Sequence, residues 1–308
     1  MAEPKAAPLF PASFVPFAVE TAEGVTIRGL HNPSTSSSKP PLLLLHGFPQ
    51  THAIWHLVAP ALAQQYTLVL ADLRGYGASS KPPPSATHAA YAKSALAADC
   101  AAVMTALGHS RFSVLAHDRG ARVAHKLCVD FADRVEKAIL LDIVPTKACY
   151  AATDKDFARW YWHWFFLIQP APLPETLING MGGGKFVRMM LTGREPGTGF
   201  FAEHALSAYE EAGELEGAVH AWCEDYRAAA GVDCDEQEAD EREGRKIKAP
   251  LLVLWGKKGV VEACFDAIKE WEKVSVGGVK GRALECGHYV PEAQPEELVK
   301  EVLAFLAE

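Results

Sequence analysis

The chain has 308 residues with a formal net charge of −8; 49% of its residues are hydrophobic and 22% are charged. These values are typical of a globular protein that is long enough to bury a large core. The acidic balance, without a dense stripe of lysine and arginine, argues against nucleic acid as a partner, and it means that an anionic ligand must be attracted by local positive charge.

Short β-branched or leucine-rich runs alternate with helical patterns along the chain, which predicts a parallel sheet with crossover helices. An antiparallel hairpin is expected first, with strands at 14–20 and 25–31. Further strands are predicted at 41–46, 67–72, 112–117, 137–143, 251–255 and 282–285. Helices are predicted at 52–64, 89–107, 121–131, 264–271 and 295–307.

A long stretch separates the predicted strands at 137–143 and 251–255. It is too long for a loop and rich in tryptophan, tyrosine and phenylalanine, so we expect a helical cap over the ligand-binding end of the sheet. The predicted organisation is a first core segment at 1–146, a cap at 147–246 and a second core segment at 247–308. The acidic stretch 233–243 is expected to be a solvated segment that needs no partner.

Asp118 lies at the sharp break between the strand at 112–117 and the helix at 121–131. A strained strand-to-helix turn of this kind pushes one side chain into a pocket. A serine at this corner would suggest an acyl-enzyme. An aspartate instead predicts attack on carbon, which displaces a leaving group and gives an alkyl ester that water then opens.

Two arginines follow Asp118 at the start of the helix. Arg119 and Arg122 are three residues apart, so both side chains can point toward one pocket. Together with the positive potential of the helix N-terminus, they should keep Asp118 ionised and bind a second carboxylate that belongs to a substrate. A lone Asp–Arg pair is often only a surface contact, but the position between a buried strand and a helix favours a small anionic substrate.

His288 lies in a glycine-containing loop between the last predicted strand and the final helix. Ligands of open α/β sheets bind beyond the carboxyl ends of the strands, so we predict that His288 is the general base that activates water against the ester. The base needs a carboxylate partner. Asp142, at the end of the strand at 137–143, is the preferred candidate, and Glu262 is the fallback because no aspartate closely follows the strand at 251–255.

The reaction produces two negative charges, the oxyanion of the ester intermediate and the leaving halide. Hydrogen-bond donors for them come from a turn and from the cap. A backbone N–H at Phe48, with that of Arg119, is predicted to form the oxyanion hole for hydrolysis of the ester. A halide leaves as a small anion, and the segments 160–166 and 222–227 offer indole, imidazole and phenol donors for it. For most of these aromatic residues, packing inside the cap is the simpler role.

Several of these blocks occur in one order through core and cap. They are HGFPQTH at 46–52, HDRGAR at 117–122, LDI at 141–143, HW at 163–164, QPAPLPE at 169–175, CEDYR at 223–227 and GH at 287–288. On these blocks, from about residue 40 to the C-terminus, the sequence resembles the haloacetate dehalogenase family, and its fluoroacetate dehalogenases in particular.

The resemblance implies an α/β-hydrolase fold, with a mostly parallel sheet, helices on both faces and an inserted helical cap. It implies Asp118 as the nucleophile, His288 as the base and Asp142 as its acid. It further implies that Arg119 and Arg122 bind the substrate carboxylate and that three cap residues, His163, Trp164 and Tyr226, surround the halide. No cofactor and no metal are expected, and members of this family are usually homodimers.

Three other functions are alternatives for the same residues. A haloalkane dehalogenase would favour tryptophan at position 119, and its neutral substrate gives no use for two arginines. A soluble epoxide hydrolase uses the same Asp–His–acid chemistry, but it requires two cap tyrosines and usually has tryptophan where Arg119 stands. Tyr226 could be the first tyrosine, with Tyr161 or Tyr209 as the second. A non-catalytic ligand receptor built on the same fold is the third alternative, against which the apparently complete set of reactive residues argues.

The cysteines and the N-terminus bear on the compartment. Seven scattered cysteines without a CxxC spacing indicate neither a disulfide framework nor a zinc site. The sequence 1–14 has no charged start followed by a long apolar core, and no apolar run is long enough to cross a bilayer. We therefore expect a cytoplasmic protein with no membrane partner.

Overall fold

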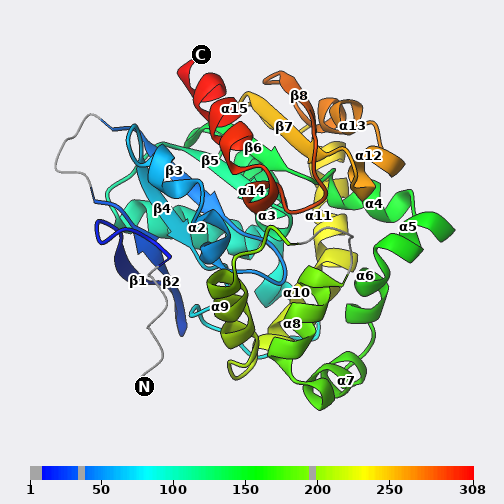
Figure 1. The fold of residues 1–308 in the computed structure, drawn as a ribbon. Coiled ribbons are helices and arrows are strands. Elements are labelled where there is room, and N and C mark those ends of the chain that lie inside the picture. Colours follow the sequence, from blue (N-terminus) through cyan, green and yellow to red (C-terminus); the bar gives the residue numbers. More distant parts are fainter. Residues whose placement is uncertain (1–8, 34–38, 194–198) are drawn as a thin grey trace, which may run out of the picture.

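A single sheet of eight strands forms the centre of the protein in the computed structural model, which describes residues 9–33, 39–193 and 199–308 (Figure 1). The strands are β1 (Val15–Ala22), β2 (Val25–His31), β3 (Pro41–Leu45), β4 (Thr67–Ala71), β5 (Phe112–His117), β6 (Val135–Leu141), β7 (Leu251–Gly256) and β8 (Val279–Leu284). Their order in the sheet is β1-β2-β4-β3-β5-β6-β7-β8. β2 pairs antiparallel with β1 and β4, and all other neighbours are parallel, so the predicted mostly parallel sheet is confirmed.

Helices cover both faces of the sheet because successive strand residues point to opposite sides. Leu43 and Leu45 belong to a hydrophobic cluster with α2 (Lys93–Ala106) and α3 (Arg119–Asp130). The alternate residues of β3 pack with α1 (Ala59–Leu62) and α15 (Pro295–Ala307) on the other face. The carboxyl ends of β3, β5 and β6 therefore meet at one buried edge between these helix layers.

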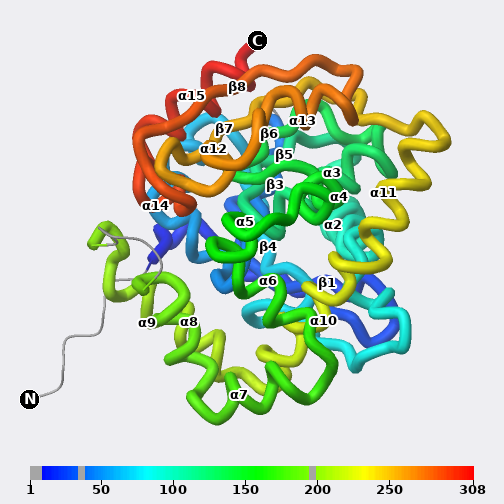
Figure 2. The backbone as a smooth tube through the Cα atoms, turned by 90° about the vertical axis from the view of Figure 1, so that its right-hand side faces the viewer, coloured from blue at the N-terminus to red at the C-terminus, as the bar shows by residue number. Residues whose placement is uncertain are grey.

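A helical insertion joins β6 to β7. Its helices are α4 (Thr146–Ala151), α5 (Lys155–Trp160), α6 (Trp162–Leu167), α7 (Leu173–Met181), α8 (Gly183–Thr192), α9 (Glu203–Gly213), α10 (Ala218–Ala230) and α11 (Val232–Arg242). α7, α8 and α9 follow one another in the lower half of both views, and α7 lies farthest from the strands (Figures 1 and 2). The cap boundaries at 147 and 246 remain a prediction.

Two predicted helices have different bounds in the structure. The helix expected at 52–64 is divided into η1 (His52–Trp55) and α1, because Pro60 has no N–H to continue a hydrogen-bonded ladder. The helix expected at 264–271 begins later, as α13 (Ala267–Val274), because a separate short helix, α12 (Val260–Cys264), ends at Cys264. Asp266 caps α13, since its Oδ1 accepts a hydrogen bond from the N–H of Lys269 at 3.2 Å.

The prediction that 233–243 is a solvated segment without a partner is wrong. This stretch forms most of α11, and Asp233 is only 2% exposed. Asp233 Oδ1 accepts a hydrogen bond of 2.7 Å from the backbone of Lys93, and Asp240 Oδ2 accepts one of 2.9 Å from Lys126. These acidic residues are seven apart, which places them on one helix face, so the charges face cations of the core instead of solvent.

No helix in the three described ranges combines the length and the apolarity that spanning a bilayer requires. The first eight residues, on which the expectation about a leader partly rests, lie outside these ranges.

Candidate active site

Asp118 lies directly between β5 and α3. Its φ of 48° is positive, which is uncommon for a residue other than glycine and is typical of a strained, tight turn. Two glycines allow neighbouring backbone to approach it. A Cβ atom on Gly47 would lie 2.4 Å from Asp118 Cβ, and one on Gly120 would lie 2.3 Å from the carbonyl oxygen of His46. The loop after β3 therefore closes tightly on this aspartate, which is 5% exposed.

The two carboxylate oxygens of Asp118 have different surroundings. Oδ1 accepts a hydrogen bond of 2.8 Å from the backbone N–H of Phe48. Oδ2 lies 3.9 Å from His288 Nε2, which is too long for a direct hydrogen bond. The contact from Phe48 thus fixes one oxygen and leaves the other facing the imidazole.

His288 is oriented by Asp142. Its Nδ1 lies 2.5 Å from Asp142 Oδ2, and Asp142 Oδ1 accepts a hydrogen bond of 2.8 Å from the N–H of Gly256. Because Nδ1 donates to the carboxylate, Nε2 is the atom that can take up a proton. The fallback acid, Glu262, accepts from the indole N–H of Trp255 instead. The structure therefore places Asp142, and not Glu262, beside the histidine.

The charges around Asp118 favour its ionised form. Burial alone would raise the pKa of this carboxyl, but His288, His117 and the two arginines outweigh burial and lower it. Burial lowers the pKa of His117 to about 3, so His117 is neutral at pH 7 and the arginines are the permanent cations. His117 Nε2 donates to the backbone carbonyl of His288 at 2.9 Å, which supports the loop that carries the imidazole.

Arg119 is fully buried, and one of its nitrogens has no hydrogen-bond partner among the residues that the structure describes. Its Nε and Nη2 donate to Oδ2 and to the backbone carbonyl of Asp225, both at 2.7 Å. Its guanidinium carbon lies 4.2 Å from the centre of the Tyr226 ring. Among the described residues, no atom accepts a hydrogen bond from Nη1.

Arg122 is 3% exposed, and its hydrogen-bond partners within the described ranges are neutral. Nη1 donates to the carbonyl of Val144 at 3.1 Å and to Thr146 Oγ1 at 3.0 Å, and the guanidinium lies 4.6 Å from the centre of the Trp164 ring. Its Nε has no hydrogen-bond partner in the described part of the chain. Two buried guanidinium groups beside Asp118 thus retain donors for an anion.

The ring of Phe48 joins the predicted halide residues to the nucleophile loop. It stacks on His163 with ring centres 6.0 Å apart, and it meets the edge of Tyr226 at 5.3 Å. Trp164 lies 6.1 Å from Tyr226, and its buried Nε1 has no acceptor among the residues that the structure describes. The structure thus brings all three predicted halide residues, His163, Trp164 and Tyr226, together beside Phe48.

A comparison with known protein families settles the class of this fold. The sequence matches the family model described as the alpha/beta hydrolase fold over residues 40–261, which is most of the chain. The protein is an α/β hydrolase. The predicted fold is confirmed, and Asp118 occupies the strand-to-helix corner at which this fold carries its nucleophile.

Relatives of this α/β hydrolase catalyse more than one reaction. The chain is 38% identical over 271 residues to a fluoroacetate dehalogenase from Burkholderia sp, a match that covers 88% of each chain. It is 31% identical over 279 residues to a soluble epoxide hydrolase from Corynebacterium sp. (strain C12), covering 89% of this chain and 92% of the relative. A solved α/β hydrolase from Nostoc sp PCC 7120 has 44% identity and a TM-score of 0.90, with 95% of this chain and 98% of that chain covered.

Sequence reasoning missed two buried carboxylates of the hydrolase. Asp225 accepts a hydrogen bond from Arg119. Its position directly before Tyr226 in the CEDYR block is the feature of the sequence that could have indicated this role. Glu292 accepts hydrogen bonds from Gln50 Nε2 at 2.6 Å and from the Tyr209 hydroxyl at 3.0 Å. No local pattern marks Glu292. Its contact directs Tyr209, one of the tyrosines considered for epoxide opening, toward this carboxyl.

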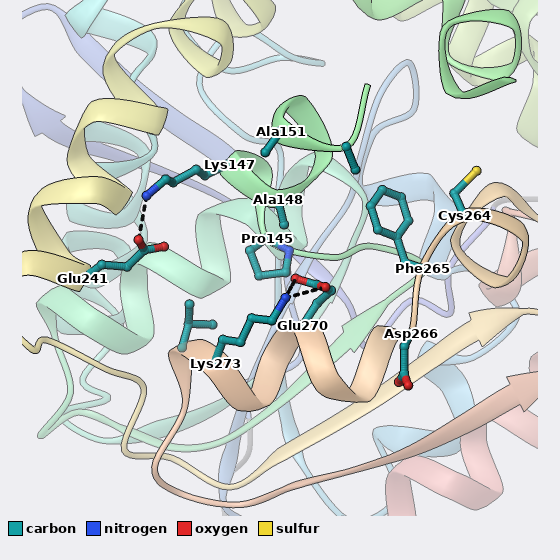
Figure 3. A pocket seen from close by; sticks show the side chains of 12 residues that line it. Pro145, Lys147, Ala148, Ala151, Glu241, Cys264, Phe265, Asp266, Glu270 and Lys273 are labelled. Carbon is teal, nitrogen blue, oxygen red and sulfur yellow. Dashed lines mark hydrogen bonds and ion pairs between the residues drawn. The ribbon is translucent and has the colours of Figure 1, made fainter. Parts of the chain in front are cut away.

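A surface groove of about 470 Å³ lies apart from these residues, among α4, α11, α12 and α13 (Figure 3). Its lysines are paired, Lys147 with Glu241 and Lys273 with Glu270, and no predicted site residue lines it. Within the described ranges, no group of three or more His, Cys, Asp or Glu side chains is arranged to hold a metal ion. Asp118, His288 and Asp142 thus lie outside this groove.

Proposed function

We propose that the protein hydrolyses the carbon–halogen bond of a small 2-haloacid, such as fluoroacetate or chloroacetate, to the 2-hydroxy acid and halide. One observation carries this proposal: two buried arginines beside Asp118 keep donors, Arg119 Nη1 and Arg122 Nε, without partners among the described residues. A carboxylate on the substrate would satisfy both through charge-assisted hydrogen bonds. A neutral substrate would leave them desolvated and unpaired.

In the first half-reaction, Asp118 Oδ2 attacks the α-carbon of the substrate, because Oδ1 is held by the N–H of Phe48. The new C–O bond forms as the C–X bond breaks, and the halide leaves with the bonding electron pair. Trp164, with His163 and Tyr226 beside it, supplies donor groups for this anion within an aromatic wall that excludes water.

In the second half-reaction, His288 Nε2 takes a proton from water as the water oxygen attacks Cγ of the Asp118 ester. Charge develops on Oδ1, where the N–H of Phe48 already donates. Asp142 stabilises the imidazolium that forms. The tetrahedral intermediate then expels the 2-hydroxy acid, which takes its proton from the imidazolium and carries the former Asp118 oxygen.

Epoxide hydrolysis is the second candidate, and the similarity to a soluble epoxide hydrolase favours it. The hydroxyl-bearing rings of Tyr226 and Tyr161 flank His163, with ring centres 5.8 Å and 5.7 Å from it. Epoxide opening would use these tyrosines as acids, but it gives no role to the donors of Arg119 and Arg122.

Halide release from fluoro-, chloro- and bromoacetate, assayed beside diol formation from styrene oxide, tests the proposal. We expect halide from at least one haloacetate and no reaction with the epoxide. The Asp118→Asn variant is the control for background hydrolysis. Diol formation without release of any halide would contradict the proposed dehalogenation and favour epoxide hydrolysis.

A further inference from the structure

Arg119 belongs to a buried cluster of four charged residues that spans core and insertion. Asp225 on α10 accepts from Arg119 Nε at 2.7 Å and from Lys93 Nζ at 2.5 Å. Lys93, on α2, also lies 3.0 Å from Asp233 Oδ2 on α11. None of the four side chains is more than 2% exposed.

The charges of this cluster cancel. Burial would raise the pKa of Asp225, but Arg119 and Lys93 outweigh it and hold this pKa well below its usual range, so the carboxyl is ionised. The hydroxyl of Tyr76 also donates to Asp225 Oδ2, at 2.7 Å, without adding charge. Two cations therefore face two carboxylates where solvent does not screen them.

Arg122 differs from Arg119 in this respect. In the described ranges no carboxylate lies within ion-pair distance of its guanidinium, whose partners are a carbonyl, a hydroxyl, the thiol of Cys149 and an aromatic ring. Arg122 helps to lower the pKa of Asp118, and the negative charge of Asp118 disappears when the ester forms. The positive charge of Arg122 is thus available to an anionic ligand.

We propose that Asp225 is a positioning residue that limits how tightly the pocket binds a carboxylate: it orients Arg119 and cancels its charge, leaving Arg122 as the cation that recognises the substrate's charge. This inference rests on the proposed function. Substrate and 2-hydroxy acid product share the same carboxylate, so affinity for that group lowers KM without speeding the chemical step, and it delays product release. A second uncompensated arginine would strengthen this shared affinity.

Binding of acetate, an unreactive probe of the same charge, tests the inference by titration calorimetry at fixed pH and ionic strength. Asp225→Asn keeps an oxygen acceptor for Arg119 but removes the compensating charge, so acetate should bind about fivefold more tightly. Asp233→Asn is the matched control, because it removes one charge from the same cluster, and in the described ranges the Asp233 carboxylate pairs only with Lys93. It should change the affinity less than about twofold.

Steady-state kinetics separate positioning from loss of folded protein. With chloroacetate, Asp225→Asn should lower KM and kcat together, since a tighter carboxylate site slows release, whereas partial unfolding lowers kcat alone. Acetate affinity that is unchanged or weaker in Asp225→Asn, or equally tightened in Asp233→Asn, would overturn the inference.

A double variant covers the case in which Asp225→Asn fails to fold. Arg119→Gln combined with Asp225→Asn replaces an ion pair of zero net charge with a pair of uncharged amides. Buried sites often tolerate such a change. Acetate affinity should then fall less than roughly tenfold, compared with roughly fiftyfold for Arg122→Gln. Equal losses would contradict the inference, whereas a parent protein that does not bind acetate at all would count against the proposed function itself.

Discussion

The backbone N–H of Phe48 donates a hydrogen bond of 2.8 Å to Oδ1 of Asp118. This contact distinguishes the two oxygens of one carboxylate, because Oδ2 faces His288 Nε2 at 3.9 Å. The same N–H orients the attacking group in the resting protein and lies where negative charge develops when the ester is hydrolysed. One backbone donor thus serves both halves of the proposed reaction.

Replacing Asp118 with asparagine should abolish turnover, since the change removes the attacking charge and keeps the shape of the side chain. Halide release from chloroacetate is expected to fall by roughly 10⁴-fold. Asp156→Asn, at an exposed site on α5, is the matched control and should leave the rate unchanged. Multiple turnovers by the Asp118→Asn variant would assign the attack to another group.

His288→Asn should trap the ester, because attack by Asp118 does not need the imidazole but hydrolysis does. Intact-mass spectrometry after exposure to chloroacetate is expected to show a carboxymethyl adduct on the protein. The double variant with Asp118→Asn should show none. An unmodified His288→Asn protein that has nevertheless released halide would contradict the two-step scheme.

Arg122→Leu should weaken substrate binding, since the substrate carboxylate loses a buried, charge-assisted partner. We expect KM for chloroacetate to rise roughly 10- to 100-fold. Arg122→Lys keeps the charge without the fork of donors and should give an intermediate value. A KM equal to that of the parent would remove Arg122 from the carboxylate site.

Glu292 should make the folded protein less stable in alkali. Burial raises the pKa of this carboxyl from 4.5 to about 8, so the folded state binds the proton more tightly than the unfolded state does. The contribution is fully present below pH 4.5 and is lost as the pH rises through 8, by about 5 kcal/mol at most.

Thermal unfolding of the parent and of Glu292→Gln between pH 5 and pH 9 measures this contribution. The Tm of the parent should fall more steeply with rising pH than the Tm of the variant, because the amide of the variant does not titrate. Parallel curves for the two proteins would show that Glu292 is already ionised when buried.

The sequence predicts best those features that are local to the strands. β5 lies where its apolar run predicts, ending at His117 directly before Asp118, and the carboxyl ends of parallel strands meet at one edge. Asp142 and His288 therefore meet although 146 residues separate them. This part of the candidate site follows from strand order alone.

The buried charge pairs could not be predicted in this way. Arg119 and Asp225 are 106 residues apart, and Asp225 reaches Arg119 only because α10 of the insertion packs over the core. The acidic run in α11 has the composition of a solvated segment, but the spacing of its carboxylates matches cations on α2 and α3. Composition reports how many charges a segment has, whereas packing decides which of them become buried.

A single turnover in water enriched in oxygen-18 tests most directly whether Asp118 forms a covalent ester. The enzyme is used in excess over chloroacetate, then digested, and both the peptide that contains Asp118 and the glycolate are analysed by mass spectrometry. We predict label in the peptide and none in the glycolate, because water replaces the oxygen that the aspartate has given up. An unlabelled peptide together with labelled glycolate would mean that water attacks the substrate directly.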